Sequence, residues 1–529
     1  MTDDPNASWE CTGHPPGSHQ KIENYGDTCL LCPKKRPGLQ PANGKEGSQE
    51  IPWRAIAGAV LLAILGIAAW LWISKPHPKP EEVAQSPSPT TSPTTSPTIP
   101  PTTTPSSVLP ASAPERYSSG ERRLFIGKPN ADGDLGTKEF QAANYSQARD
   151  FFEKAVQGDR NSPELQIYLN NAKARLAGSP FTLAAVVPVD GGTASAEEIL
   201  RGVADAQAKF NDAGGLDKRL LEIVIANDGN DPPISAGVAQ ELAKNPNILG
   251  VIGHNASDAS KAALVEYEKA GIPMVSPTST STTLSGSTFF RTVPSDAVSG
   301  KKLGNYAWTT LRIDKVAIFY NPNSTYSSSL QQAFEANFKQ AGGTILRSID
   351  MSNPAFKPQD EIKALQGQVG AIVLLPNTQF TTVAIALAVA NSQQPTGQQM
   401  KLLGGDAVYS STTLTSGGNA VEGLIIAVPW FPQTPYAQTA EKRWLGQVSW
   451  RTAVSFDATQ ALIKALSSSA SRSTVLQNLK SINISPAETS GAVVMFETTG
   501  DRLGEPILVQ VTKGSGGPTG SPFAFKLIQ

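Results

Sequence analysis

Short apolar runs that alternate with helix-like segments after Phe181 constrain the fold of this chain most. Phe181–Pro188 and Leu220–Ala226 each lead into a polar loop and then a helix-like stretch. Similar runs occur at 315–320, 344–350, 370–375, 401–404 and 424–428. Repeated strand and helix units predict parallel sheets covered by helices on both faces. Residues 181–529 are too many for one sheet with a single core, so the sequence predicts two α/β lobes with a cleft between them.

Two of the predicted strands end in loops that suit a ligand. Leu249–Ile252 and Ile272–Val275 each run into small hydroxyl and amide residues, and these loops include Ser257, Thr278 and Thr280. Backbone N–H groups and helix N-termini point to the carboxyl ends of parallel strands, where a carboxylate would bind. The same residue types also cap helices and form turns. From these residues alone, ligand binding and a role in caps and turns are both open interpretations.

A wider set of stretches follows the order of one family. They are 200–207, 211–215, 239–249, 290–296, 321–326, 404–406, 455–458 and 491–502. Residues 181–529 resemble the branched-chain amino-acid (Leu/Ile/Val) binding proteins of bacterial ABC importers, which have the type I periplasmic-binding fold. The resemblance implies two doubly wound lobes, joined by a three-stranded hinge, that close over a ligand. Lobe 1 would comprise about 181–298 and 430–500, and lobe 2 about 299–429 and 501–529.

The resemblance also implies a site for an amino acid or a similar small polar solute. Ser257 matches the hydroxyl that holds the ligand's α-carboxylate, and Thr280 and the backbone around Thr278 share that role. The ammonium group would be held by the Thr278 carbonyl, the Thr280 hydroxyl and Asp406. Because an amino acid is a zwitterion, such a site needs neutral donors at one end and a carboxylate at the other.

Two more positions are carried over from the family, and the sequence departs from its pattern at two others. Tyr326 matches a tyrosine that folds over the ligand from lobe 2, and Asp296 matches an acidic position at the first crossover. Phe380 stands near the place of a second aromatic lid without a clear match. Asp258 is an added acid that fits a helix-capping role. The alternative is that Asp258 and Asp190 favour a polar, amidated or basic ligand.

The first 50 residues carry little apolar periodicity, but they hold all three cysteines of the chain. The candidate metal ligands are Cys11, His14, Cys29 and Cys32. Two close pairs of such ligands resemble a small zinc ribbon, in which metal binding supplies the free energy of folding that a missing core cannot. His19 is an alternative to His14. The competing interpretation is isolated thiols in a disordered segment.

Ala55–Ile73 contains 19 residues without a charge, with Trp53 before it and Trp70 and Trp72 at its end. This pattern predicts a single transmembrane helix with interfacial aromatic residues. A cleaved signal peptide is the rival, but signal peptides have a shorter preceding region. More Lys and Arg residues precede the helix than follow it, which predicts a cytoplasmic N-terminus in a bacterial inner (plasma) membrane and a periplasmic or extracellular body.

Residues 74–119 form a predicted linker, since Pro, Ser and Thr make up 24 of the 29 residues from Ser86 to Pro114. Residues 120–178 have a helical pattern, and 132–176 resemble one tetratricopeptide repeat and the start of a second. Such repeats bury a continuous core only as a longer stack. A helical hairpin packed against its neighbour, or used as a spacer, is the alternative to a peptide-binding role.

The net charge and the absence of common catalytic motifs limit the classes of function that this sequence predicts. The net charge of −1 does not favour a nucleic-acid partner. The body contains one histidine, His254, and neither a GxSxG elbow nor a phosphate loop, so we do not expect an enzyme. The predicted function is a membrane-anchored binding protein that delivers its ligand to ABC permease subunits. A receptor that signals to a cytoplasmic partner through the zinc module is the alternative.

Overall fold

The computed structural model describes residues 9–11, 22–24, 113–515, 517 and 520–528. The predicted transmembrane helix at 55–73 and most of the predicted linker at 74–119 lie outside these residues, as do His14, Cys29 and Cys32. Within the described ranges, no helix has the length and apolar character needed to cross a membrane. Near the N-terminus, β1 (Trp9–Cys11) pairs antiparallel with β2 (Ile22–Asn24).

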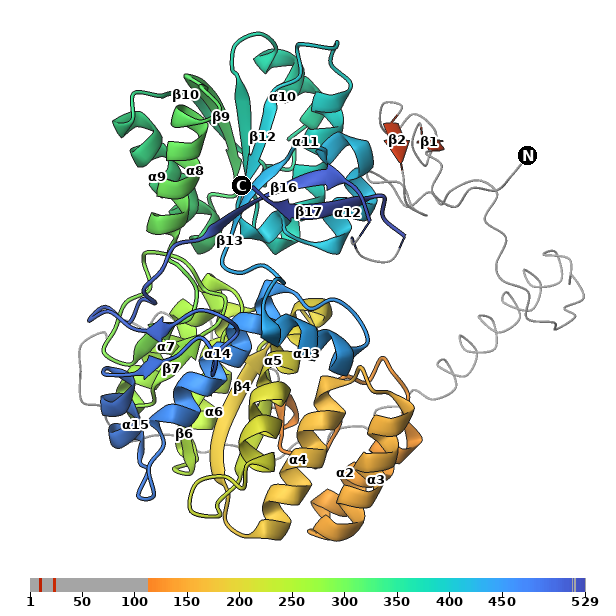
Figure 1. The fold of residues 1–529 in the computed structure, drawn as a ribbon, viewed down its shortest axis with the longest axis vertical. Helices are drawn as coiled ribbons and strands as arrows, with labels where there is room; N and C mark the ends of the chain where they lie inside the picture. Colours follow the sequence, from red (N-terminus) through yellow and green to blue (C-terminus); the bar gives the residue numbers. More distant parts are fainter. Residues whose placement is uncertain (1–8, 12–21, 25–112, 516, 518–519, 529) are drawn as a thin grey trace, which may run out of the picture. The chain divides into compact units, whose positions relative to one another are not determined.

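The predicted α/β fold with two lobes is confirmed, and each lobe is built on its own sheet (Figure 1). Lobe 1 has six strands in the order β3 (Tyr117–Ser118), β5 (Leu221–Asn227), β4 (Phe181–Val187), β6 (Ile248–Ile252), β7 (Met274–Ser276), β8 (Phe289–Arg291). All of them run parallel except β3. Every residue of β4 is buried, since helices cover both faces of a parallel sheet.

Lobe 2 has seven strands and a mixed sheet. Their order is β10 (Thr344–Asp350), β9 (Lys315–Tyr320), β11 (Ala371–Leu375), β12 (Lys401–Gly404), β13 (Ile425–Val428), β16 (Ile507–Lys513), β17 (Phe523–Leu527). The first five are parallel, and β16 and β17 join antiparallel. A separate short pair, β14 (Asn483–Ile484) and β15 (Val494–Met495), precedes the last crossover. The chain thus passes between the lobes three times.

Helices cover both sheets. In lobe 1 they are α5 (Thr193–Asp212), α6 (Pro232–Lys244), α7 (Ser257–Ala270), α13 (Pro435–Trp444), α14 (Trp450–Ala465) and α15 (Arg472–Leu479). In lobe 2 they are α8 (Asp296–Thr309), α9 (Thr325–Gln340), α10 (Pro358–Leu365), α11 (Thr381–Ser392) and α12 (Ser411–Gly417). Short 3₁₀ turns stand at η1 (Ala113–Arg116), η2 (Thr378–Phe380), η3 (Asp406–Val408) and η4 (Gly418–Val421).

The segment before β4 belongs to lobe 1. Its helices are α2 (Ala131–Gln141), α3 (Tyr145–Gly158) and α4 (Pro163–Ala177); α4 lies beside α5, α3 packs against α4, and α2 packs against α3 (Figure 1). Phe152 and Tyr168 are fully buried in the same apolar cluster as the strands of this lobe. The Asn171 amide donates to the Ile223 carbonyl at 2.8 Å and accepts from the Ile223 N–H at 2.9 Å. It thereby satisfies backbone groups of β5 beyond the short pairing with β3. The resemblance to a tetratricopeptide repeat stays a prediction.

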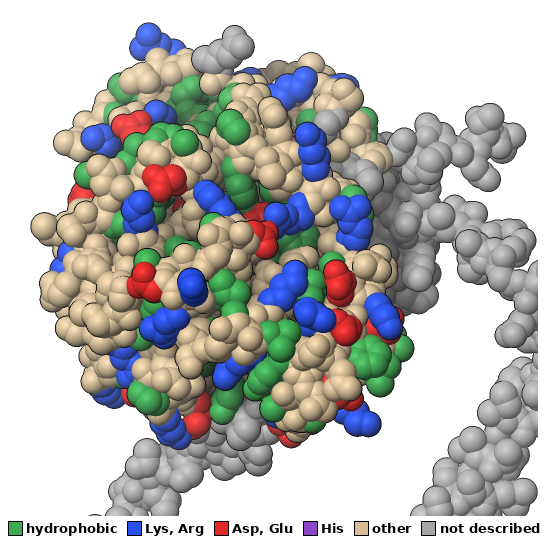
Figure 2. Space-filling view, turned by 60° about the horizontal axis from the view of Figure 1, so that its bottom comes forward, with side chains coloured by type: hydrophobic (Ala, Val, Ile, Leu, Met, Phe, Trp, Pro, Cys, Tyr) green, Lys and Arg blue, Asp and Glu red, His purple; other side chains and the backbone are tan. Residues whose placement is uncertain are grey.

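Charged side chains are mixed on the surface. On the face seen in Figure 2, basic and acidic groups are interspersed, in keeping with the formal net charge of −1.

The packing of α5 against α14 predicts the effect of one substitution. A Cβ on Gly202 would lie 2.1 Å from the Thr452 carbonyl oxygen and 2.6 Å from the Phe456 nitrogen. We expect Gly202→Ala to lower the free energy of unfolding by about 1 to 3 kcal/mol, because two backbones would have to separate. Urea denaturation of the full-length protein measures this. Gly446→Ala is the control, since nothing lies within 4 Å of that position; equal losses in both variants would contradict the packing argument.

Candidate ligand-binding site

A cavity of about 430 Å³ opens between the carboxyl ends of the strands of both lobes. Lobe 1 contributes the loops after β5, β6 and β7 and the start of α14, through Asn230, Pro232, Asn255, Ala256, Ser257, Asp258, Thr278, Trp450 and Arg451. Lobe 2 contributes the loops after β9 to β12, through Asn321, Asn323, Ser324, Tyr326, Ser352, Asn377, Thr378, Gln379, Phe380, Asp406 and Ala407. The cavity therefore needs both lobes to be complete.

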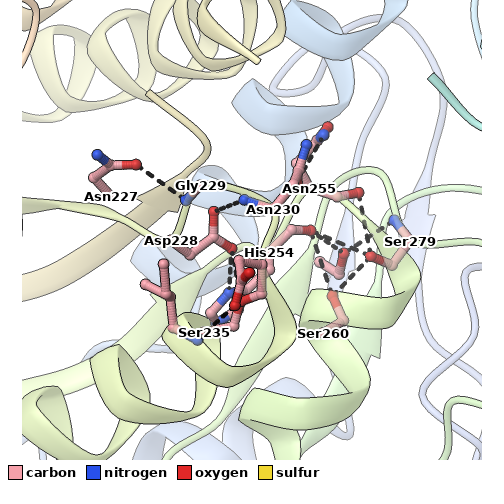
Figure 3. Close-up of polar contacts among 12 residues, drawn as sticks. Asn227, Asp228, Gly229, Asn230, Ser235, His254, Asn255, Ser260 and Ser279 are labelled. Carbon is pink, nitrogen blue, oxygen red and sulfur yellow. Dashed lines mark hydrogen bonds and ion pairs between the residues drawn. The ribbon is translucent and has the colours of Figure 1, made fainter. Parts of the chain in front are cut away.

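The lobe 1 wall is held by a buried network around His254, which follows β6 (Figure 3). Its Nδ1 lies 2.7 Å from Asp228 Oδ2, and its Nε2 lies 3.0 Å from the Tyr267 hydroxyl. The other oxygen of Asp228 accepts the Asn230 N–H at 3.1 Å, and Asn230 in turn accepts from the Asn255 amide at 3.2 Å. The network ties the loops after β5 and β6 together. His254 is thus a satisfied buried residue.

The hydroxyl residues of lobe 1 bind their own loops as well as lining the cavity. Thr278 Oγ1 donates to the Asn255 carbonyl at 2.8 Å, and Ser279 Oγ donates to the His254 carbonyl at 3.2 Å. Ser257 is the first residue of α7, and its Oγ accepts the Ser281 N–H at 3.4 Å. Ser257 and Thr278 therefore hold their loops together and also border the cavity, while the N-cap of α7 is Ala256 and has no side-chain capping bond.

Tyr326 and Asp406 meet in the lobe 2 wall. The Tyr326 hydroxyl donates to Asp406 Oδ1. Burial raises the pKa of Asp406, while the hydrogen bond from Tyr326 and the positive charge of Arg451 oppose that rise. Arg451 comes from α14 of lobe 1, so charges from both lobes meet at the cavity.

Thr280 and Asp296, both predicted to bind ligand, do not line the cavity. They are neighbours, and the Asp296 N–H donates to the Thr280 carbonyl at 2.8 Å. Burial raises the pKa of Asp296 to about 7, and the negative charge of Asp406 adds to the shift. Thr280 Oγ1 and Asp296 Oδ2 have no hydrogen-bond partner among the described residues.

Asp258 links the lobes instead of only capping its own helix. It stands in the first turn of α7, but its Oδ1 accepts the Thr325 N–H at 2.9 Å and also the Thr325 hydroxyl. Its Oδ2 accepts from Ser324 Oγ at 3.4 Å. A second link joins the Thr282 N–H to Ser329 Oγ at 2.9 Å. The negative charge of Asp258 therefore lies at the N-terminus of α9 in the other lobe.

Sequence reasoning missed the contribution of α14 and most of the amides. Trp450 and Arg451 begin this helix after the N-cap Ser449, and both are buried. Their positions in the chain carry no motif. An arginine at the start of a buried helix was the available signal, because an arginine is rarely buried without a partner or a ligand. Phe380, considered as a second aromatic lid, does line the cavity.

The fold and the cavity define a two-lobed α/β binding protein. A family model described as "Periplasmic binding protein" matches residues 180–517, and the chain belongs to this family. An amino acid binding protein of Pseudomonas aeruginosa is 30% identical over 159 residues, which are 29% of this chain and 42% of that protein. A leucine-specific-binding protein of Salmonella typhimurium is 24% identical over 314 residues, 57% of this chain and 82% of that one.

Comparison with solved structures gives the same fold. A leucine binding protein from Thermotoga maritima has a TM-score of 0.57 at 20% identity, covering 65% of this chain and 97% of that one. The predicted resemblance to the leucine-binding family with the type I periplasmic-binding fold is confirmed.

The raised pKa of Asp296 predicts a pH dependence of stability. Between about pH 4 and pH 7 the folded protein keeps a proton on Asp296 that the unfolded chain, with the ordinary value of 3.8, has released. Stability therefore falls as the pH rises through this window, by at most about 1.4 kcal/mol per pH unit from this group. We expect Asp296→Asn to remove that part of the slope.

Urea denaturation of wild type and Asp296→Asn at several pH values between 4 and 8 measures the difference. Asp314→Asn, which changes an exposed carboxylate of lobe 2, is the control. Parallel pH profiles for wild type and Asp296→Asn would show that Asp296 is ionised in the folded state throughout.

Proposed function

We propose that this protein is an extracytoplasmic substrate-binding protein that captures an amino acid or a similar small polar solute by lobe closure, for delivery to an ABC importer. The observation that carries the proposal is the cavity shared by both lobes, with hydroxyl residues of lobe 1 facing Tyr326 and Asp406 of lobe 2. The named amino-acid ligands of the relatives support it.

The chemistry of the walls matches a zwitterion. Hydroxyl and amide donors, with the start of α7, suit the carboxylate of an amino acid, and the carboxylate of Asp406 suits its ammonium group. Closure of the lobes would remove water from both ends of the ligand and strengthen these contacts. In this proposal Ser257, Thr278 and Tyr326 contact the ligand. Thr280 and Asp296 lie behind the cavity wall and do not contact the ligand.

The N-terminal part completes the proposal. Residues 55–73 would anchor the protein in the bacterial inner membrane with a cytoplasmic N-terminus, and the linker at 74–119 would let the body reach a permease. Cys11, His14, Cys29 and Cys32 would bind a structural zinc ion. Of these four, Cys11 lies among the described residues, at the end of β1, whose pairing with β2 suits a small ribbon. Elemental analysis for stoichiometric zinc tests this site.

Calorimetric titration of the full-length protein with a panel of amino acids, amides and urea tests the binding function. For a bound amino acid, we expect Asp406→Ala to weaken binding by about 2 to 5 kcal/mol, because the ammonium would be buried without its partner. Asp360→Ala, which removes an exposed carboxylate of lobe 2, should leave the affinity unchanged. A loss below about 0.5 kcal/mol in Asp406→Ala would exclude this residue from the site.

Crosslinking in native membranes separates delivery from signalling. Capture of a permease subunit by the body would support delivery to an importer. Capture of a cytoplasmic protein by the N-terminal segment, without a permease, would favour the receptor alternative.

A further inference from the structure

The wall of the cavity between the lobes is unusually rich in side-chain amides. Five asparagines and one glutamine line it, namely Asn230, Asn255, Asn321, Asn323, Asn377 and Gln379. Within the described part of the chain, no Leu, Ile, Val or Met side chain lines the same cavity. A branched aliphatic ligand side chain gains its binding free energy from apolar contacts; Tyr326, Phe380 and Trp450 offer some, but the six amides would lose hydrogen bonds to water without replacement.

Some of these amides are held in pairs within each lobe. The Asn255 amide donates to Asn230 Oδ1 at 3.2 Å in lobe 1, and the Asn321 amide donates to Asn377 Oδ1 at 3.3 Å in lobe 2. A side-chain amide has two N–H donors and an oxygen that accepts two hydrogen bonds. One shared bond therefore positions both amides and leaves each with further capacity for a polar ligand.

Trp450 supplies an independent observation. Its side chain lines the cavity and is 2% exposed, yet its Nε1 has no hydrogen-bond partner among the described residues. A buried N–H donor without a partner is costly, and because this nitrogen is not exposed to the cavity here, a ligand acceptor would reach and satisfy it once the wall moves on lobe closure.

Arg451 adds positive charge beside this donor. Its guanidinium lies 4.4 Å from the centroid of the Trp450 ring, and the Arg451 side chain is 8% exposed. Its ion pair is with Glu198, at 3.5 Å, which is a long contact for a group with five N–H donors. The start of α14 thus presents donors and a positive charge to the cavity.

We propose that the ligand is a polar amino acid whose side chain ends in a carboxamide or carboxylate, as in glutamine or glutamate, rather than a branched-chain amino acid. This inference rests on the proposed function and adds the class of the ligand. The amide wall hydrogen-bonds the ligand side chain, and its terminal oxygen accepts from Trp450 Nε1 and Arg451. The amide wall and these two residues determine specificity.

Competition among amino acids on the full-length protein tests the inference. Calorimetry should give glutamine, asparagine, glutamate or aspartate an affinity at least tenfold higher than leucine and isoleucine. The tightest-binding of these four ligands shows whether the site prefers a carboxamide or a carboxylate at the end of the ligand side chain. Tighter binding of leucine or isoleucine would overturn the inference and leave the proposed function standing. Binding of an amide or urea but of no amino acid would overturn the inference alone, and binding of no amino acid, amide or urea would overturn both.

Two substitutions test the named groups. Trp450→Phe keeps an aromatic ring but is smaller and lacks the N–H donor, so it should weaken the polar ligand about tenfold and leucine by a clearly smaller factor. Gln379→Leu places an aliphatic side chain on an exposed position of the wall, which makes misfolding a small risk. It should reduce the ratio of the affinity for the polar ligand to the affinity for leucine by about threefold or more.

Matched controls keep the result interpretable. Gln368→Leu makes the same change at an exposed glutamine outside the cavity and should leave the preference as in wild type. Thermal unfolding of each variant tests that it folds. If Trp450→Phe is folded and lowers the affinities for the polar ligand and for leucine by the same factor, Trp450 has a packing role and the assigned hydrogen bond is overturned.

Discussion

The parallel pairing of strands in both sheets is the constraint on which the rest of this structure depends. Parallel strands need crossover helices, so every loop that follows a strand emerges at the same edge of its sheet. In lobe 1 these are the loops after β5, β6 and β7, and in lobe 2 those after β9 to β12. Because the two edges face each other, loops far apart in the sequence form one cavity.

Polar groups then make these loops rigid. The carbonyl of His254 accepts hydroxyls from the loop after β7, while its imidazole lies between Asp228 and Tyr267. Such a network costs free energy if any member is left unpaired, but when satisfied it permits one arrangement of the loops. The hydroxyl residues of lobe 1 therefore hold the loops together, and Ser257 and Thr278 line the cavity as well.

Two polar links join the lobes. Asp258 joins the start of α7 to the start of α9, and Thr282 joins Ser329. Apolar packing is shared as well, because the Tyr409 ring of lobe 2 contacts the apolar clusters of both lobes. The polar links exchange with water at little net free energy. Lobes joined in this way are suited to open and close, which the proposed function requires.

The sequence by itself determined the elements and the family. Largely apolar runs predicted β4, β9 and β11 to within a residue or two, because strands buried on both faces carry few polar side chains. Ordered motifs from 200 to 502 identified the fold. Ser257 and Thr278 could be placed at the cavity from their positions after predicted strands, and Tyr326 and Asp406 from the resemblance to the family.

Only the tertiary structure decided which side chains share the cavity wall. Trp450 and Arg451 follow no predicted strand and reach the cavity because α14 packs along α5 after the chain has returned to lobe 1. Asp258 fitted a cap for its own helix, but its partner is the helix of the other lobe. Periodicity reports which face of an element is buried, and it carries no information about which distant element packs there. Packing between remote segments therefore set the amide-rich wall and left the Trp450 N–H without a partner among the described residues.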